Sequence, residues 1–110
     1  MKITKKKEVI EEEVEIIAGT YYFECEQGEF HKMELGETGN EGITNYRCTY
    51  VYNFSDMFGI KVREDYSYDE EGLPYKFSAF IRGISGKEII KEKYETERKE
   101  VLKRIADVNK

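Results

Sequence analysis

Residues 85–108, SGKEIIKEKYETERKEVLKRIADV, decide the fold, because they form the longest stretch of the chain with a helical pattern. Ser85 and Glu88 have the spacing of a capping box, in which the serine oxygen accepts from the backbone N–H of Glu88 and the glutamate carboxylate accepts from the backbone N–H of Ser85. Opposite charges four residues apart, as at Glu95 and Lys99, favour the helix further along. The sequence therefore predicts one long C-terminal helix.

The apolar face of this predicted helix is narrow. At about 100° per residue its apolar side chains lie within about 60° of one another, and Glu97 interrupts the stripe that they form. The stripe consists of Ile90, Tyr94, Val101, Ile105 and Val108. We expect the start of the helix to cover part of a sheet. Its distal half, with Val101, Ile105 and Val108, is expected to reach a second sheet edge or to pair with a second copy in a homodimer.

The length and composition of the chain indicate a single domain. It has 110 residues, of which 39% are apolar and 14% aromatic, and this suffices for one small core but not for two. We divide it into a flexible basic N-terminus (residues 1–7), an antiparallel sheet (8–82) and the C-terminal helix (85–108). No apolar run is long enough for a membrane span or a signal peptide, so the expected location is the cytoplasm, where the two cysteines would be reduced thiols.

The part of the chain before the helix has the alternation of β-strands. The clearest case is residues 43–54, where an aromatic set points to one side and a largely polar set to the other. Further strands are predicted at 9–17, at 75–82 and around reversals at 18–19, 27–29 and 55–59. Residues 9–17 also have helical spacing, and the turn that follows them favours a strand. The predicted fold is α+β, an antiparallel β-meander of about five strands with one long C-terminal helix packed on one face.

Folding the chain back at these reversals predicts a register for the sheet. Each register was chosen because it gathers apolar side chains on one face, and a shift by one residue would move them to the other. The predicted partners are Ile16 with Tyr21, Cys25 with His31, and Phe54 with Ile60.

The net charge of −5 is unevenly distributed along the chain. Residues 8–41 carry eleven acids against one lysine, whereas residues 85–110 carry eight basic and six acidic residues. The predicted pairing sets glutamates opposite one another, so this face needs a cation from residues 5–7, from the helix or from another molecule. Such a surface opposes nucleic-acid binding and favours a protein partner with a basic surface. Its candidate binding residues are Glu11, Glu13, Glu15, Glu24 and Glu26.

Cys25, His31 and Cys48 form the candidate chemical site. The predicted register sets the Cys25 thiol beside His31, and Cys48 shares that face if its strand is adjacent. A thiol beside an imidazole is typical of an activated nucleophile or of part of a metal site. The structural alternative is that both cysteines pack as small apolar side chains and that the histidine is a satisfied core group. A zinc site would need a fourth ligand that the spacing does not supply, so no metal is predicted.

Tyrosines gather on the predicted aromatic face. The chain has nine tyrosines and six phenylalanines, a balance that suits either a partly covered core face or a binding surface. These strands carry few cations for nucleic-acid phosphate, which disfavours stacking of bases. The candidate binding residues are Tyr46, Tyr50, Tyr52, Tyr66 and Tyr68.

The sequence indicates binding rather than catalysis. It has no glycine-rich phosphate loop, no Cys-x-x-Cys, no His-x-x-x-His, no Gly-x-Ser-x-Gly and a single histidine. We therefore expect a non-enzymatic acidic protein without a cofactor. It would act by binding another macromolecule, most readily a protein, for example as an inhibitor or as a nucleic-acid mimic. Two alternatives stay open. One is a small-ligand module with a Tyr-lined pocket between helix and sheet, and the other is a thiol-dependent enzyme at Cys25 and His31.

Overall fold

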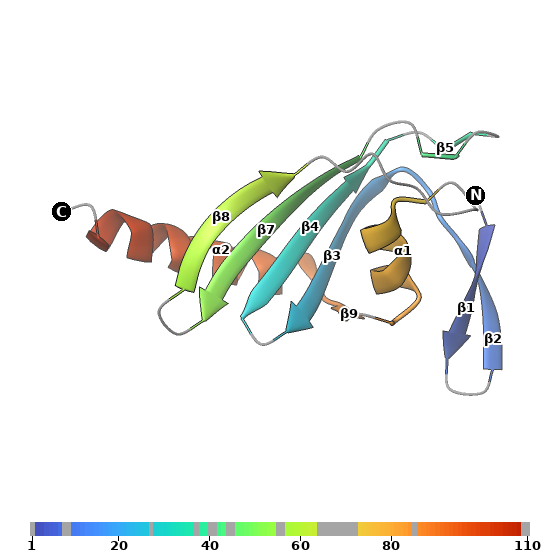
Figure 1. Cartoon of the computed structure of the whole chain (residues 1–110), viewed down its shortest axis with the longest axis horizontal. Helices are drawn as coiled ribbons and strands as arrows, with labels where there is room; N and C mark the ends of the chain where they lie inside the picture. The colour runs from blue at the N-terminus through green and yellow to red at the C-terminus, as the bar shows by residue number, and fades with distance from the viewer. Residues whose placement is uncertain are drawn as a thin grey trace.

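The computed structural model describes residues 2–7, 10–26, 28–36, 38–39, 42–43, 46–54, 57–63, 73–84 and 86–108, and for 2–7, 10–14, 38–39 and 42–43 it describes the backbone alone. A five-stranded sheet and two helices form the centre of the molecule (Figure 1). The fold is α+β, as predicted. Neither of the described helices is long and apolar enough to cross a membrane.

The sheet has the strand order β8-β7-β4-β3-β9, and all neighbours in it are antiparallel. Strands β3, β4, β7 and β8 follow one another as the predicted meander does. Two further hairpins, β1–β2 and β5–β6, pair outside this sheet. The bounds are β1 Lys2–Lys7, β2 Ile10–Glu15, β3 Gly19–Glu26, β4 Glu29–Leu35, β5 Thr38–Gly39, β6 Gly42–Ile43, β7 Tyr46–Phe54, β8 Met57–Arg63 and β9 Lys87–Glu88.

One face of the sheet, here called the inner face, packs on helix α1 (Tyr75–Ile81). The alternation predicted for β7 is confirmed there, because Tyr46, Cys48 and Tyr50 are buried in this layer. The layer is aromatic, and the ring of Phe23 stacks on that of Phe80 with centroids 5.3 Å apart. The other buried members are Ile16, Met33, Leu35, Leu73, Phe77 and Ile81.

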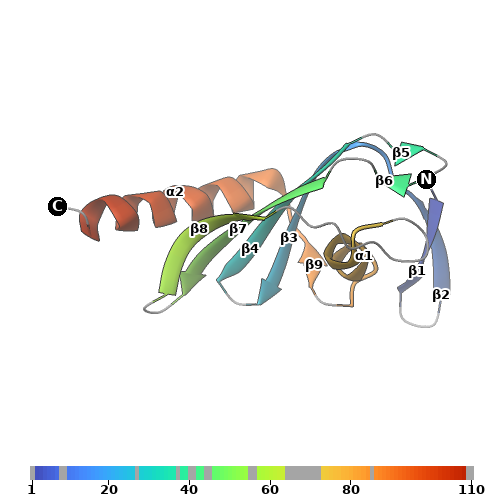
Figure 2. The same ribbon diagram turned by 45° about the horizontal axis from the view of Figure 1, so that its top comes forward.

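The opposite face, here called the outer face, packs on helix α2 (Lys91–Val108). Figure 2 shows the two helices on opposite sides of the sheet. Tyr94 and Val101 of α2 are 0% exposed and pack with Phe30 and Val51 of the sheet. The predicted packing of the C-terminal helix on one face is confirmed, but α2 covers the face with the more polar pattern, and α1 covers the aromatic one.

Helix α2 begins at Lys91 and not at Ser85. The residues before it form β9 on the edge of β3, and the N–H of Ile89 donates to the carbonyl of Tyr22 at 2.9 Å. These hydrogen bonds satisfy backbone groups on the edge of β3, which would stay unpaired if the helix began earlier. The predicted capping box is therefore wrong, since Glu88 lies in a strand, while Ser85 lies outside the described residues.

Helix α1 (Tyr75–Ile81) occupies the place of the last strand predicted at 75–82, so that prediction is wrong. Apolar residues alternate in this segment, but its buried positions recur at helical spacing. Pro74 stands just before the first turn, and Gly83, with φ 75°, follows the last, which is the usual placement of these residues at helix ends. The buried positions are Leu73, Pro74, Phe77, Ser78, Phe80 and Ile81.

The β3–β4 register is shifted from the predicted one by two residues. Phe23 lies opposite His31, because the hairpin turn is one residue tighter and a β-bulge at Cys25 adds a second residue. An even shift leaves every side chain on its predicted face. The tight turn depends on Gly28, which has φ 86° and where a Cβ would lie 2.6 Å from the Cβ of Phe54.

The β7–β8 register is shifted by three residues. Phe54 pairs with Met57, whereas the sequence predicted a longer loop and a partner at Ile60. An odd shift exchanges the two faces of a strand. Ile60 therefore packs against the outer core instead of joining the aromatic inner face.

The N-terminal segment forms strand β1, where a flexible terminus was predicted. The strand predicted at 9–17 is present as β2, but its partner is β1 and not β3. Lys5 occupies the position paired with Glu12, and Lys6 the position paired with Glu11. The backbone register therefore places lysine positions of β1 opposite glutamate positions of β2, a pattern that favours the hairpin.

Candidate functional site

Cys25, Glu29, His31 and Cys48 come together on the inner face and are here called the inner cluster. Glu29 and His31 are two residues apart on β4 and so share a face, and the bulge of β3 lies next to them. The Cys25 thiol, a Glu29 carboxylate oxygen and a His31 ring nitrogen lie within 4.8 Å of one another. Cys48 Sγ is 3.8 Å from His31 Nδ1. The structure thus brings together the three residues predicted from sequence and adds Glu29.

His31 is the centre of the inner cluster and is only 1% exposed. Its Nε2 atom lies 2.9 Å from a carboxylate oxygen of Glu29, and its ring packs against Tyr50 with centroids 4.5 Å apart. With the proton on Nε2, the imidazole donates to Glu29, and Nδ1 accepts from the Cys48 thiol. Both ring nitrogens are then satisfied, which fits the structural alternative drawn from the sequence.

The electrostatics of the inner cluster disfavour thiol catalysis. Burial, helped by the charge of Lys76, lowers the pKa of His31 to about 4, while the adjacent Glu29 carboxylate acts in the opposite direction. Burial, followed by the charges of Glu29 and Glu26, raises the pKa of the Cys25 thiol. The lowered pKa makes His31 a weak base, and the raised pKa makes the Cys25 thiol a weak acid, so His31 is poorly suited to deprotonate Cys25.

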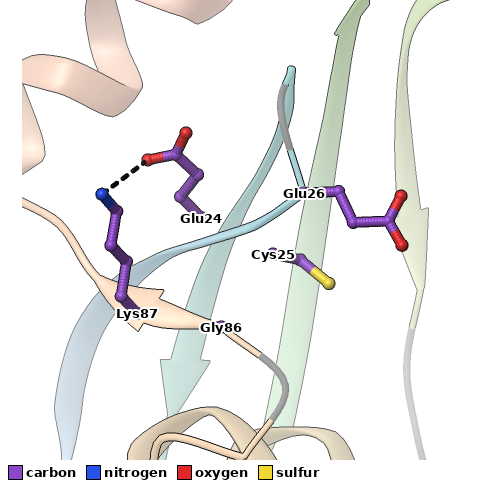
Figure 3. A pocket seen from close by; sticks show the side chains of 5 residues that line it. All are labelled: Glu24, Cys25, Glu26, Gly86 and Lys87. Carbon is purple, nitrogen blue, oxygen red and sulfur yellow. Dashed lines mark ion pairs between the residues drawn. The ribbon is translucent and has the colours of Figure 1, made fainter.

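A cavity of about 320 Å³ opens beside Cys25. Figure 3 shows the Glu24 carboxylate turned toward Lys87 and the Cys25 thiol pointing away from that pair. Glu24 is held by two cations, with Lys93 Nζ at 2.9 Å and Lys87 Nζ at 3.8 Å. The half-buried Cys25 thus connects the inner cluster with a cavity that opens to solvent. The cavity is lined by Glu24, Cys25, Glu26, Gly86 and Lys87.

The outer face changes from apolar to polar along the strands. Paired positions on β4, β7 and β8 form rows across the sheet, and α2 packs on the apolar row. The rows beside it are polar and form the floor of a groove. The apolar row is Phe30, Val51 and Ile60, and the polar rows are Lys32 with Thr49 and Val62, and Glu34 with Arg47.

This groove, here called the outer groove, has a volume of about 420 Å³. Its wall is α2, which contributes Tyr94, Glu95 and Arg98. The groove contains three cations against two carboxylates, so it is locally positive in a chain whose net charge is −5. The cations are Lys32, Arg47 and Arg98, and the acids are Glu34 and Glu95.

The Tyr94 hydroxyl is buried at the outer groove and has no hydrogen-bond partner within the described part of the chain. The ring packs on Tyr22 with centroids 5.2 Å apart. Burial raises the pKa of Tyr94 to about 12, against the opposing charge of Arg98, so the hydroxyl keeps its proton and remains a donor. Leaving such a group unpaired costs roughly 1–3 kcal/mol. A ligand atom that accepted from Tyr94 would recover that free energy.

The predicted tyrosine surface belongs largely to the core. Tyr46 and Tyr50 are 8% and 3% exposed, so a partner could not reach them. Tyr52 is half-buried and packs against the same inner core. Tyr66 and Tyr68 lie outside the described residues. The Tyr-lined pocket predicted between the helix and the aromatic face is instead filled by α1.

The predicted acidic surface is divided among different surroundings. Glu11 and Glu13 lie in β2, opposite the lysine-rich β1. Glu15 and Glu26 are exposed, whereas the Glu24 carboxylate is bound by lysines from the end of the chain. Of the three whose side chains the structure describes, Glu24 and Glu26 line the cavity beside Cys25, and Glu15 is not among its lining residues.

The distal half of α2 packs on the sheet of its own chain. Val101 is 0% exposed and Ile105 packs against the outer core, so the predicted homodimer surface is wrong at these two residues, and Val108 alone of the three is exposed. Glu97, which interrupts the apolar stripe, accepts a 2.7 Å hydrogen bond from Asn53 Nδ2. This acid anchors α2 to β7 and leaves no gap in the contact.

Sequence reasoning missed Glu29, Tyr94 and Arg98 as site residues. A signal existed for each: Glu29 is two residues from His31 on a strand, and Tyr94 is four residues from Arg98 on a helix. No family model matches the sequence, and neither a curated protein nor a solved structure matches it. The function is therefore inferred from the geometry of the inner cluster and the outer groove.

Proposed function

We propose that the protein is a non-enzymatic binding protein whose outer groove holds an acidic side chain of a protein partner. The observation that carries this proposal is the Tyr94 hydroxyl, a buried donor without a described acceptor at a locally positive groove. A carboxylate has no proton to donate and accepts hydrogen bonds only, so it matches a hydroxyl donor beside a guanidinium.

The side chains over Tyr94 can make room for this carboxylate. Arg98 lies one helical turn beyond Tyr94 on the same side of α2, and Glu95 follows Tyr94 directly. Both are only half-buried, and their long side chains change rotamer at little cost. A change of the Arg98 rotamer toward an incoming carboxylate would pair the guanidinium with the same ligand that accepts from the Tyr94 hydroxyl.

The form of the outer groove supports a protein partner over a small molecule. Small-molecule sites are mostly enclosed and apolar, whereas this groove is open and its lining is mainly polar. Val62, which is 47% exposed, adds an apolar contact beside the charged groups. Protein interfaces combine polar and apolar contacts in this way. The partner inferred here is acidic, where the sequence suggested a basic one, because the positive groove replaces the acidic face as the candidate surface.

The proposal places the protein in the cytoplasm. Support comes from Cys25, whose thiol forms no disulfide with another described residue, as expected in a reducing compartment.

A peptide titration tests the proposed function. The probe is a capped hexaglutamate peptide added to isotope-labelled protein, with capped hexaglutamine as the neutral control. We expect the backbone signals of Thr49, Tyr94 and Arg98 to shift with the acidic peptide and not with the neutral one. Arg98→Gln should weaken binding by about tenfold or more, because a charge-assisted hydrogen bond is lost.

Lys103→Gln is the matched control for Arg98→Gln. It removes the same charge from an exposed position of α2 that does not line the groove, and it should change the affinity less than twofold. Equal loss in both variants would reduce the binding to general charge attraction and overturn the proposal. Acetate that produces the same shifts with the same affinity per carboxylate would replace the protein partner by a small anion.

A further inference from the structure

We infer that Cys25, Glu29 and His31 form a binding site for a zinc-type transition-metal dication. This inference concerns the inner face and does not depend on the function proposed for the outer groove. The three donor atoms, a sulfur, an oxygen and a nitrogen, already lie within 4.8 Å of one another. Metal–ligand distances of 2.0–2.3 Å in a tetrahedral site bring such atoms to about 3.5 Å apart.

The three donor atoms need to move only slightly closer together, and two of the side chains that carry them are free enough to move. The Glu29 side chain is 20% exposed and Cys25 is half-buried, while His31 is fixed by the surrounding core. Rotation of the two partly exposed side chains toward a fixed imidazole therefore closes the site without repacking of the core. The bulge at Cys25 supplies this freedom, because the bulged residue is left out of the regular pairing with β4.

Cys48 supports the inferred site from behind His31. A metal on Nε2 leaves the ring proton on Nδ1, which then points at Cys48 Sγ, 3.8 Å away. Metal-binding histidines regularly donate their second N–H to an acceptor of this kind, which fixes the orientation of the ring. Without metal, the Cys48 thiol donates to His31 Nδ1. With metal bound, the Nδ1–H group donates to Cys48 Sγ, so the same pair of atoms stays hydrogen-bonded with the roles reversed.

The charges and donor types favour zinc over magnesium or calcium. A thiolate and a carboxylate together offset the charge of a dication, and the thiol loses its proton on binding. The charge of Lys76 acts against the metal but favours the thiolate. Sulfur and nitrogen donors select zinc-type ions, whereas the alkaline-earth ions require oxygen.

The cavity beside Cys25 provides the entry path and the open position. The half-buried Cys25 lines this open cavity, and Figure 3 shows its thiol among the lining side chains. Three protein ligands and one position open to water are the arrangement of a catalytic or exchangeable zinc site, whereas a structural zinc has four protein ligands. The missing fourth ligand, which excluded zinc on sequence grounds, is therefore compatible with an open site.

A cobalt titration tests the inference. Cobalt(II) added to the fully reduced protein should bind in one equivalent and give a thiolate-to-cobalt charge-transfer absorption, and zinc should displace it, since zinc binds such sites more tightly. Cys25→Ala should abolish the charge-transfer band. Cys48→Ala, which removes the other thiol, should retain the band with an affinity lowered about 10–100-fold.

Three results would overturn the inference. They are the absence of cobalt binding by folded wild-type protein, a band that survives in Cys25→Ala, and a band that is lost in Cys48→Ala. If Cys25→Ala does not fold, Glu29→Gln replaces it and should weaken cobalt binding at least tenfold; an unchanged affinity would contradict the site. Arg98→Gln should bind cobalt like the wild type, so this test and that of the outer groove can fail separately.

Discussion

The two faces of the central sheet are formed by the same strands, but they differ in how the hydrogen-bonding groups buried on them are satisfied. On the inner face, His31 is a buried polar group, and Glu29 and Cys48 lie at its two ring nitrogens. On the outer face, the buried hydroxyl of Tyr94 has no partner among the residues that the structure describes. α1 fills the aromatic inner face, whereas α2 covers one apolar row and leaves polar rows open. The inner face therefore holds the larger buried core, and the outer face holds the groove that is proposed to bind a partner.

The largest expected effect is a difference between the two faces in how much a core truncation lowers the free energy of unfolding. Phe77→Ala on the inner face should lower the free energy of unfolding by about 3–5 kcal/mol, because Phe77 is completely buried and its ring packs on those of Tyr21 and Phe23 at 5.0 and 6.0 Å. Val101→Ala, the matched truncation on the outer face, should cost about 2 kcal/mol. Urea unfolding followed by circular dichroism measures both, and a larger loss for Val101→Ala would reverse the comparison.

The pH dependence of stability is the next effect and belongs to the inner face. The pKa of His31 is lowered to about 4 in the folded state, from 6.5 in an unfolded chain, so on acidification the unfolded state takes up a proton first. The free energy of unfolding should therefore fall by about 2 kcal/mol between pH 7 and pH 5. His31 is the only histidine, and carboxylates of ordinary pKa titrate mainly below this window.

Glu29→Gln sharpens the pH prediction. The Glu29 carboxylate favours the protonated imidazole, so its removal should lower the His31 pKa further and leave the slope of stability between pH 7 and 5 at least as steep. A wild-type stability that stays constant or rises on acidification from pH 7 to 5 would show that His31 is charged in the folded protein.

A smaller effect concerns the polar attachment of α2 to the outer face. Asn53 donates to Glu97 and accepts from Arg104 at 2.5 Å, so Asn53→Ala should lower the free energy of unfolding by about 1–2 kcal/mol. Thr96→Ala is the control, because its hydroxyl is exposed and bonds within α2, and its effect should stay within about 0.5 kcal/mol. Similar values for both variants would mean that the apolar row alone holds α2.

The sequence predicted the fold best where one face of an element is buried along its length. The alternation of Tyr46, Cys48 and Tyr50 identified the inner face of β7, because a half-buried strand imposes a period of two. It failed at residues 75–81, where apolar residues fit both periods and tertiary packing on β3 decided for a helix. It also failed at 85–88, where the open edge of β3 outweighed a local capping signal.

The two candidate sites differed in how far the sequence could predict them. Cys25 and His31 were associated correctly, because a hairpin brings its two strands together whichever even register it adopts. The outer groove joins Lys32, Arg47 and Arg98 from three elements, and their proximity depends on which face α2 covers. No local sequence pattern predicts which face of the sheet α2 covers. The lysines that bind Glu24 come from the last quarter of the chain for the same reason.

The Tyr94→Phe variant tests the central claim, that an unsatisfied hydroxyl marks the outer groove as a binding site. Because the variant removes a buried donor without a described partner, the free energy of unfolding should be unchanged or rise by up to about 1 kcal/mol. The affinity for hexaglutamate should fall about tenfold in the same variant. A loss of stability above about 1 kcal/mol, or an unchanged affinity for the peptide, would contradict the claim.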